Sequence, residues 1–260
     1  MLYLLSPAKT LDFQTPIRAT VRKRATEPVF TARAAELIAH LAPLTPPQVA
    51  QLMDLSDELA ALNVARYGAW SAVATDLNGR PAALAFDGDV YGGLRAPDMT
   101  AADLDWAQRH LVILSGLYGA LRPLDRLQPY RLEMGTRLQN VRGRDLYAYW
   151  GDTIAEYLNQ RQVEERAPVI VNLASQEYFR AADRRALNAR VVECVFEDWK
   201  AGQFKVISFF AKRARGLMAR WAVQQRVASV RKLERFEAEG YAFDAAASER
   251  DRLVFRRRTD

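Results

Sequence analysis

The sequence contains few of the residues that form disulfides or bind soft metal ions. Its 260 residues include one cysteine, Cys194, and two histidines, His40 and His110. A single cysteine excludes a disulfide within the chain and fits a reducing cytoplasm. Because zinc and haem sites need more ligands of these types, we predict no metal and no cofactor; only a hard-cation site built from carboxylates stays open.

Several patterns typical of membrane proteins and common enzymes are also absent. No run of about 18 apolar residues predicts a membrane-spanning helix, and the first residues lack the segments of a signal peptide. We therefore expect a cytoplasmic protein with no membrane partner. Ser115 is not in a G-x-S-x-G motif, and no G-K-[ST] follows Gly116 and Gly119, which argues against a serine-hydrolase nucleophile and a P-loop.

Short apolar runs alternate with helical patterns along the chain. Half of the residues are hydrophobic, and neither repeats nor Gly/Ser linkers divide the sequence, so we predict one domain over residues 1–260. The pattern favours an α/β fold, a mixed sheet flanked by helices. Strands are predicted at residues 2–5, 83–88, 111–115, 169–174, 191–196 and 204–210, helices at 145–161 and 211–236, and a final pair of strands at 241–243 and 252–257.

Residues 29–75 differ from this pattern, because they predict an inserted helical subdomain without a strand. Thr45, Pro46 and Gln48 have the order of a capping box with proline at the first helical position, and Ser56 can cap the next helix. Two helices joined by so tight a connection predict a helix–hairpin–helix-like segment. A small helical packing element explains the same pattern, and periodicity alone favours this simpler interpretation.

The basic residues are unevenly distributed. The net charge is +6, and residues 195–260 hold 15 Lys or Arg against 9 Asp or Glu, which accounts for all of it. Within the neutral remainder, residues 115–144 carry six arginines against Asp125 and Glu133 only. Such segments form either a solvated positive face that keeps a protein soluble or a surface that binds a polyanion.

The stretch SGLYGALRPLDRLQPYRLEMG, residues 115–135, combines Gly, Pro, Tyr and Arg in what we expect to be a long ordered loop. Its prolines stiffen the backbone, so Arg122 and Arg131 can be held toward phosphate oxygens, which forked guanidinium donors fit well. In the alternative, these arginines pair with Asp125 and Glu133 and are structural. Long ordered loops in compact domains are often functional, and the residues alone leave both interpretations open.

Other basic residues are also candidates for phosphate contact. Lys9 follows the first strand, where open α/β sheets usually bind their ligands. Lys212 and Arg215 lie on the flank of a helix directly after a predicted strand, from which they can reach a cleft beside the sheet. Arg220 lies on the more solvated face of the same helix. Glu177 is explained by its favourable place in the first turn of a helix.

Seven motifs occur in an order that spans nearly the whole chain: LLSPAKTLDF, LMDLSDELAALN, LSGLYGALRPLDRLQPYRLEMGTRL, LYAYWGDTI, NLASQEYF, FKVISFFAKRARGLMARW and EGYAFD. Together they resemble the YaaA family of peroxide stress proteins. The resemblance implies an unusual α/β fold, a cytoplasmic location and a role in surviving hydrogen peroxide, where the family limits damage linked to free iron. It also implies binding of double-stranded DNA through a positively charged cleft and a helix–hairpin–helix element.

The hairpin at residues 52–60 departs from the usual pattern. Asp54 and Ser56 stand where glycines normally let backbone N–H groups approach a phosphate, and Asp57 and Glu58 follow them. Because carboxylates repel a polyanion, we expect the cleft rather than this hairpin to contact DNA.

Our leading hypothesis is a monomeric protein of the oxidative stress response that binds double-stranded DNA without sequence specificity. The predicted phosphate-binding residues are Lys9, Arg122, Arg131, Lys212, Arg215 and Arg220. The alternative is an enzyme that acts on a small phosphorylated or nucleotide-like substrate in the same cleft, with Glu177, Glu133 or Tyr118 as an acid–base group. A third hypothesis, direct iron binding, is disfavoured by the scarcity of His and Cys.

Overall fold

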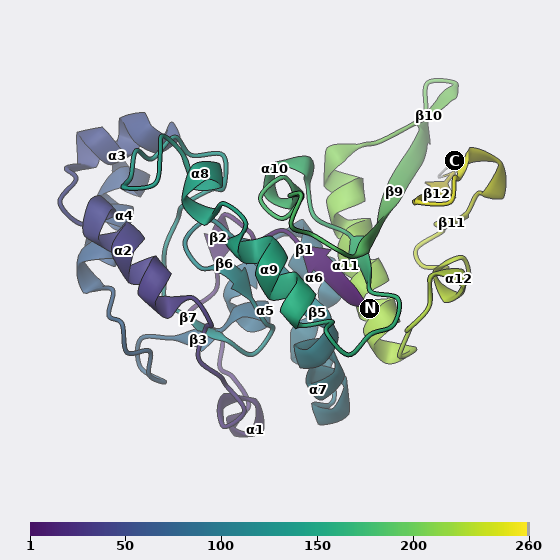
Figure 1. The fold of residues 1–260 in the computed structure, drawn as a ribbon, viewed down its shortest axis with the longest axis horizontal. Helices are drawn as coiled ribbons and strands as arrows, with labels where there is room; N and C mark the ends of the chain where they lie inside the picture. The colour runs from purple at the N-terminus through teal and green to yellow at the C-terminus, as the bar shows by residue number, and fades with distance from the viewer. Residues whose placement is uncertain (259–260) are drawn as a thin grey trace.

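The computed structural model of the protein describes residues 1–258 (Figure 1). Its centre is an eight-stranded mixed sheet in the order β11–β12–β9–β8–β1–β5–β6, with β10 paired to β9. The parallel strands are β1 (Leu2–Leu5), β5 (Leu111–Ser115), β8 (Val169–Asn172), β9 (Arg190–Lys200) and β12 (Arg252–Arg257). Three strands run antiparallel to a neighbour: β6 (Gly119–Leu121), β10 (Gln203–Lys205) and β11 (Ala242–Phe243). The mixed α/β architecture predicted from the sequence is confirmed.

The first strand, β1, lies in the middle of this sheet. It pairs in parallel with β5 through Tyr3 and Leu111, and with β8 through Leu2 and Ile170. All four of its side chains are buried, as expected for a parallel strand covered on both faces. After β1 the chain forms β5 on one side of this strand and later forms β8 on its other side. The strand order therefore reverses at β1.

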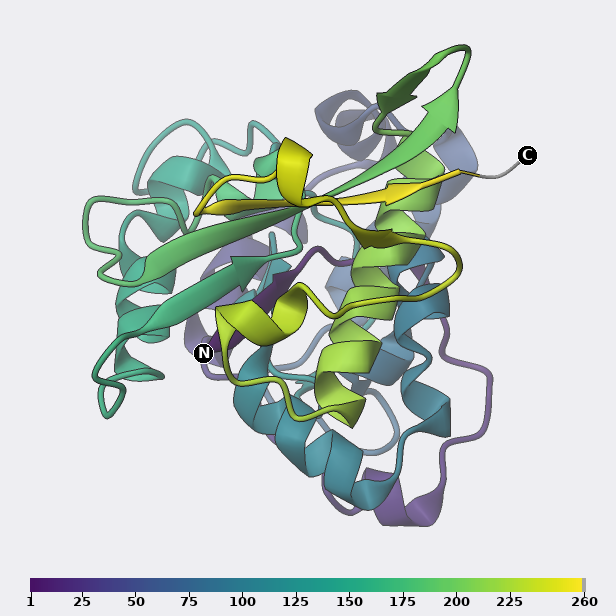
Figure 2. The ribbon, with the colours of Figure 1, turned by 90° about the vertical axis from the view of Figure 1, so that its right-hand side faces the viewer.

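Helices cover both faces of the sheet. Helix α11 (Ser208–Gln224) crosses one face and packs against α6 (Asp89–Leu94), while α9 (Thr153–Gln160) lies on the opposite face (Figure 2). The backbones of α6 and α11 meet at two glycines. A Cβ on Gly216 would lie 1.8 Å from the carbonyl oxygen of Val90, and one on Gly93 would lie 2.3 Å from that of Arg213. Only glycine permits this approach.

The remaining elements are mostly short. The two-residue strands pair as β2 (Thr10–Leu11) with β4 (Phe86–Asp87) and β3 (Arg80–Pro81) with β7 (Arg126–Leu127). The other helices outside the helical segment are α1 (Ala19–Arg22), α5 (Ala82–Ala85), α7 (Ala101–His110), α8 (Leu146–Trp150), α10 (Gln176–Phe179) and α12 (Val230–Leu233), with 3₁₀ turns η1 (Ala96–Asp98) and η2 (Ala245–Ala247). None of the helices in residues 1–258 has the length and apolarity needed to cross a membrane.

The segment predicted to be helical contains α2 (Thr31–Leu41), α3 (Pro46–Met53) and α4 (Asp57–Ala69). The capping box at Thr45 forms, since its backbone N–H donates to Gln48 Oε1 at 2.8 Å. Ser56 caps α4 by accepting from the Leu59 N–H. Between the two helices, Asp54 adopts a left-handed conformation with φ 51°.

Two of the predicted strands are largely wrong. Half of residues 83–88 belong to α5, and only Phe86 and Asp87 are extended. This alanine-rich run is buried almost throughout, so its apolar pattern cannot distinguish a strand from a buried helical turn. Residues 204–210 begin in β10, but α11 starts at Ser208.

Both long predicted helices are interrupted. The first ends at Gly151, whose φ of 50° separates α8 from α9. The second ends after Gln224, and Arg226 with φ 50° precedes the turn toward α12. The final pair of strands is confirmed as β11 and β12.

Candidate active or binding site at the carboxyl edge of the sheet

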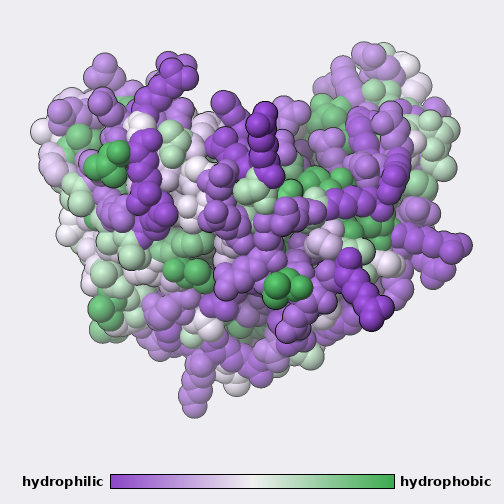
Figure 3. Space-filling view, viewed as in Figure 1, coloured by the Kyte–Doolittle hydropathy of each residue, from purple (hydrophilic) through white to green (hydrophobic). Residues whose placement is uncertain are grey.

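The carboxyl ends of β1 and β8 open on a cavity of about 470 Å³. Its walls come from separate parts of the chain: residues 6–10 after β1, 87–90 around the start of α6, 130–133, 175–178 around α10, and Lys212 and Arg215 of α11. Open α/β sheets bind ligands at this edge, in the crevice where the strand order reverses. In the space-filling view this face is mostly hydrophilic, and its upper outline dips between two higher ends (Figure 3).

Hydrogen bonds fix the floor of this cavity. The Ser175 N–H donates to Ser6 Oγ at 2.9 Å, and the Tyr91 hydroxyl donates to the Ser6 carbonyl at 3.0 Å. The β2–β4 pairing places Thr10 opposite Asp87. These contacts join the ends of β1 and β8 to the start of α6, so several distant segments share one rigid frame.

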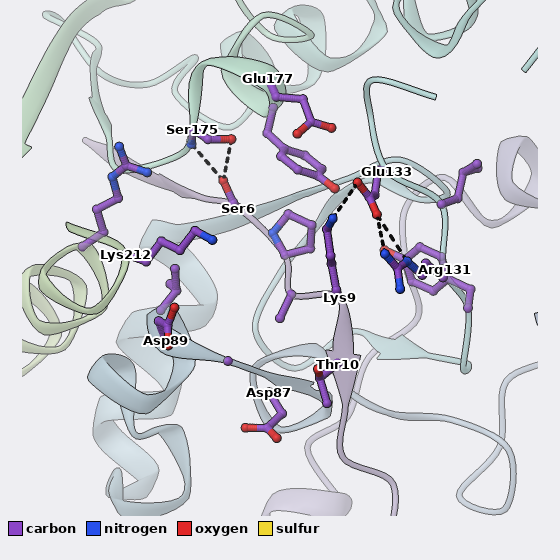
Figure 4. A pocket seen from close by; sticks show the side chains of 18 residues that line it. Ser6, Lys9, Thr10, Asp87, Asp89, Arg131, Glu133, Ser175, Glu177 and Lys212 are labelled. Carbon is purple, nitrogen blue, oxygen red and sulfur yellow. Dashed lines mark hydrogen bonds and ion pairs between the residues drawn. The ribbon is translucent and has the colours of Figure 1, made fainter. Parts of the chain in front are cut away.

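On one side of the cavity, Glu133 lies between two cations. Its carboxylate is 3.3 Å from Lys9 Nζ and 3.0 Å from an Arg131 guanidinium nitrogen (Figure 4). The Lys9 side chain is 65% exposed and that of Arg131 only 15%. Lys9 therefore lies at the mouth, whereas Arg131 is held deeper by its carboxylate partner.

On the other side, α11 contributes two cations without carboxylate partners. Within residues 1–258, neither Lys212 nor Arg215 has a carboxylate oxygen within 4.0 Å. Lys212 is exposed and Arg215 is half-buried. Burial lowers the pKa of the Arg215 guanidinium, and the more distant Glu193 partly opposes that effect.

Carboxylates match the cations of this cavity in number. The lining includes Asp87, Asp89, Glu133 and Glu177 against Lys9, Arg131, Lys212 and Arg215. Glu177 accepts a hydrogen bond from the Gly135 N–H at 2.9 Å. Figure 4 shows Lys212, Glu177 and the Lys9–Glu133 pair reaching toward the space around Ser6 and Ser175 from different sides. The site is thus a mixture of both charges rather than a uniformly positive surface.

Two buried tyrosines, Tyr130 and Tyr178, complete the wall. Burial raises the pKa of both phenols above the ordinary value. The Tyr130 hydroxyl is also 2.6 Å from Ser115 Oγ, so Ser115 is an internal hydrogen-bonding partner. Both tyrosines remain neutral near pH 7 and supply apolar surface with a polar tip.

Arg122 lies outside this cavity, at the opposite edge of the sheet. Strand β6 runs antiparallel to β5 and returns the chain to the amino ends of the parallel strands before residue 122. There Arg122 lines a separate hollow and pairs with the buried Asp125 at 2.9 Å. The prediction that Arg122 shares one cleft with Lys212 is therefore wrong, and its structural alternative describes its contacts.

Arg220 also lies outside the cavity, because it is eight residues beyond Lys212 and thus about 12 Å further along α11. Its guanidinium donates to the Arg95 carbonyl at 3.1 Å, at the end of α6. Tyr118, one of the proposed acid–base groups, is buried elsewhere and accepts a hydrogen bond from Trp70 Nε1 at 2.9 Å. The remaining four predicted phosphate-binding residues line the cavity together.

Several lining residues were not predicted as site residues: Ser6, Asp87, Asp89, Tyr130 and Tyr178. The run FDGD at residues 86–89 places two aspartates directly after a buried segment. This pattern could have indicated Asp87 and Asp89 as site residues. In the part of the chain that the structure describes, no three His, Cys, Asp or Glu side chains lie close enough to hold a metal ion.

The chain is similar to several known proteins over its full length. A UPF0246 protein of Leptothrix cholodnii is 64% identical over 257 residues, which cover 99% of this chain and 98% of the relative. A UPF0246 protein of Variovorax paradoxus is 61% identical over 261 residues, covering 99% of each chain. A third, from Bordetella avium, is 59% identical over 260 residues and 100% of each. Residues 1–247 match the family described as peroxide stress protein YaaA, and the chain therefore belongs to this family.

Proposed function

We propose that this member of a peroxide stress family binds double-stranded DNA without sequence specificity, using basic side chains around the mouth of the cavity. One observation supports this proposal: basic side chains from three distant segments lie together at one edge of the sheet. They are Lys9, Arg131, Lys212 and Arg215. Lys9 and Lys212 are exposed and are the residues best placed to reach a phosphate outside the cavity. Arg131 and Arg215 lie deeper and contribute by their charge.

Binding of this kind depends on phosphate contacts, which supply affinity without reading bases. The carboxylates in the same site reduce the local positive potential, so we expect only a few phosphates to be neutralised. With four contacts, the logarithm of the binding constant falls against the logarithm of salt concentration with a slope of about −3 to −4.

The test is fluorescence anisotropy with a labelled random-sequence duplex across a salt series. Replacing Lys9 and Lys212 together by alanine should weaken binding at low salt and make the slope shallower by about 2. Arg109→Ala is the matched control, because this exposed arginine precedes β5 at the amino edge of the sheet. An unchanged slope in the double variant, or an equal loss in the control, would contradict the assignment to the cavity mouth.

A second candidate function is an enzyme that acts on a small phosphorylated or nucleotide-like substrate. The observation that favours it is the compact cavity of about 470 Å³, with carboxylates opposite cations, since small-molecule sites commonly enclose about 300–1,000 Å³. A duplex needs a longer open groove. Glu177 and Glu133 lie in the site and keep their proposed acid–base role, whereas Tyr118 does not.

A further inference from the structure

The cavity contains two groups of charges that do not neutralise one another. Lys212 and Arg215 project from one side of α11, one helical turn apart. Glu177 of α10 and Asp87 before α6 lie away from these cations, whereas Asp89 of α6 lies on the same side of the cavity as Lys212 (Figure 4). Over residues 1–258, none of these five side chains forms an ion pair within 4.0 Å. The Lys9–Glu133–Arg131 cluster, in contrast, is already paired.

Unpaired charges in a concave site cost free energy, because water there is restricted and the charges lack direct partners. Arg215 carries this cost most clearly: it is half-buried, its pKa is lowered by burial, and Glu193 is too distant for an ion pair. An anionic group between Lys212 and Arg215 would restore the lost solvation with charge-assisted hydrogen bonds.

The opposite side of the cavity needs a different chemical group. Carboxylates accept hydrogen bonds and do not donate them, so Glu177 and Asp87 fit N–H or O–H donors. Tyr130 and Tyr178 add aromatic surface to the lining of the cavity, which suits a ring. A ligand that matches both ends therefore has an anionic terminus and a flat body rich in donors.

We propose that the cavity binds one nucleoside monophosphate unit, with its phosphate at Lys212 and Arg215 and the donors of its sugar and base at Glu177 and Asp87. This inference rests on the second candidate function and names its ligand class, and it shares Lys212 and Arg215 with the duplex-binding proposal. The unit comes either from a free nucleotide or from a single nucleotide of a DNA strand, which share a phosphate group, a sugar and a base.

Isothermal titration of the full chain with AMP, GMP, CMP and UMP tests the proposal, with adenosine and inorganic phosphate as partial ligands. We expect saturable binding of at least one nucleotide and at least about tenfold weaker binding of either partial ligand. Arg215→Met and Glu177→Gln should each weaken nucleotide binding about tenfold or more, because each removes a charge-assisted hydrogen bond. Arg109→Ala should leave it unchanged.

Absence of saturable binding for all four nucleotides would overturn the proposal. So would equal binding of inorganic phosphate alone, or wild-type affinity in folded Arg215→Met and Glu177→Gln. Circular dichroism of each variant establishes that it is folded.

Competition distinguishes the two sources of the ligand. Displacement of the bound nucleotide by a duplex with a mismatched nucleotide, but not by a fully paired duplex, supports a strand-borne unit. No displacement by either duplex supports a free nucleotide. If Arg215→Met loses nucleotide binding but keeps duplex binding, the nucleotide site is distinct from the DNA-binding site. If Lys9→Ala loses duplex binding but keeps nucleotide binding, the same conclusion follows.

Discussion

Asp125 is a fully buried carboxylate whose charge is balanced by Arg122. The Arg122 backbone N–H donates to it at 2.8 Å, its guanidinium lies 2.9 Å away, and Thr26 Oγ1 donates at 2.6 Å. A buried carboxylate needs such partners, because an uncompensated charge in the interior is strongly unfavourable. Arg122 therefore stabilises the loop that contains it.

Replacement of Arg122 by alanine should lower the free energy of unfolding by about 3 kcal/mol, the cost of leaving a buried ionic partner alone. Urea denaturation followed by circular dichroism measures the difference. The control Arg109→Ala should change stability by less than about 0.5 kcal/mol. Wild-type stability in Arg122→Ala would show that Asp125 does not depend on this partner.

Cys194 is the only cysteine, and it lies buried in β9. Burial raises the pKa of its thiol, and the neighbouring Glu193 raises it further. Since the thiolate is the form that peroxide oxidises, Cys194 should be inert in the folded protein. A thiol reagent or intact mass after hydrogen peroxide treatment should find it unmodified, and reactive once urea unfolds the chain. Rapid modification of the folded protein would instead indicate a redox role.

The crossing of α6 and α11 places Asp89 and Lys212 on neighbouring elements of the same cavity. Close backbone contact at Gly93 and Gly216 sets the distance between these helices. The helix-helix contact is therefore part of the site, although neither glycine lines it.

Gly216→Ala should destabilise the protein by about 1–3 kcal/mol, because the added methyl group forces the two helices apart. The matched control is Gly68→Ala in α4, where a Cβ meets nothing within 4 Å. That change should stabilise by about 0.5–1 kcal/mol through helix propensity. Thermal unfolding should show a lower midpoint temperature for Gly216→Ala and a higher one for Gly68→Ala. Equal shifts in the two variants would contradict the close-contact argument.

The sequence predicts an element well where one local pattern decides its structure. LYLL and LVILS are uninterrupted apolar runs and form β1 and β5, and the Thr45 capping box forms as its spacing predicts. The alanine-rich run at 83–88 has no such signal, because its burial depends on the elements packed around it. Gly151 and Arg226 end helices through backbone conformations that periodicity does not reveal.

The candidate site depends on topology more than on motif. Lys9, Lys212 and Arg215 follow strands or begin a helix at the carboxyl edge, so their convergence was predictable from the α/β pattern. Arg122 was assigned to the same place because it shares a motif with Arg131. The short antiparallel strand β6 carries the chain to the amino edge before Arg122, and the chain returns to the cavity only at residue 130. Three residues of extended chain give too weak a pattern to predict this strand.

At the scale of the whole molecule, the helical segment 29–75 shares its core with the sheet. Leu37 and Tyr67 belong to the same buried cluster as β1 and β5. Trp70 Nε1 donates to Tyr118, and the Ser71 N–H donates to Gln128 Oε1 at 3.0 Å. These contacts join the helical segment to the sheet, so we expect one folding unit, and we expect that unit to be a monomer.

Thermal or urea unfolding should therefore show one transition. Far-ultraviolet circular dichroism reports the helices and tryptophan fluorescence reports the tertiary contacts, and the two curves should coincide. Size-exclusion chromatography at several protein concentrations checks the monomer. Separate transitions would show that residues 29–75 form an independent domain.

The central place of β1 also has a consequence for how the protein is made. Leu2 pairs with Ile170 and Tyr3 with Leu111. The first strand to leave the ribosome therefore has no partner until β5 (Leu111–Ser115) has been made, and it lacks its second partner until β8 (Val169–Asn172) follows. Contacts of such long sequence separation form slowly, and an unpaired apolar strand is prone to aggregate in the meantime. A nascent chain of this protein should accordingly depend on chaperones until these partners are available.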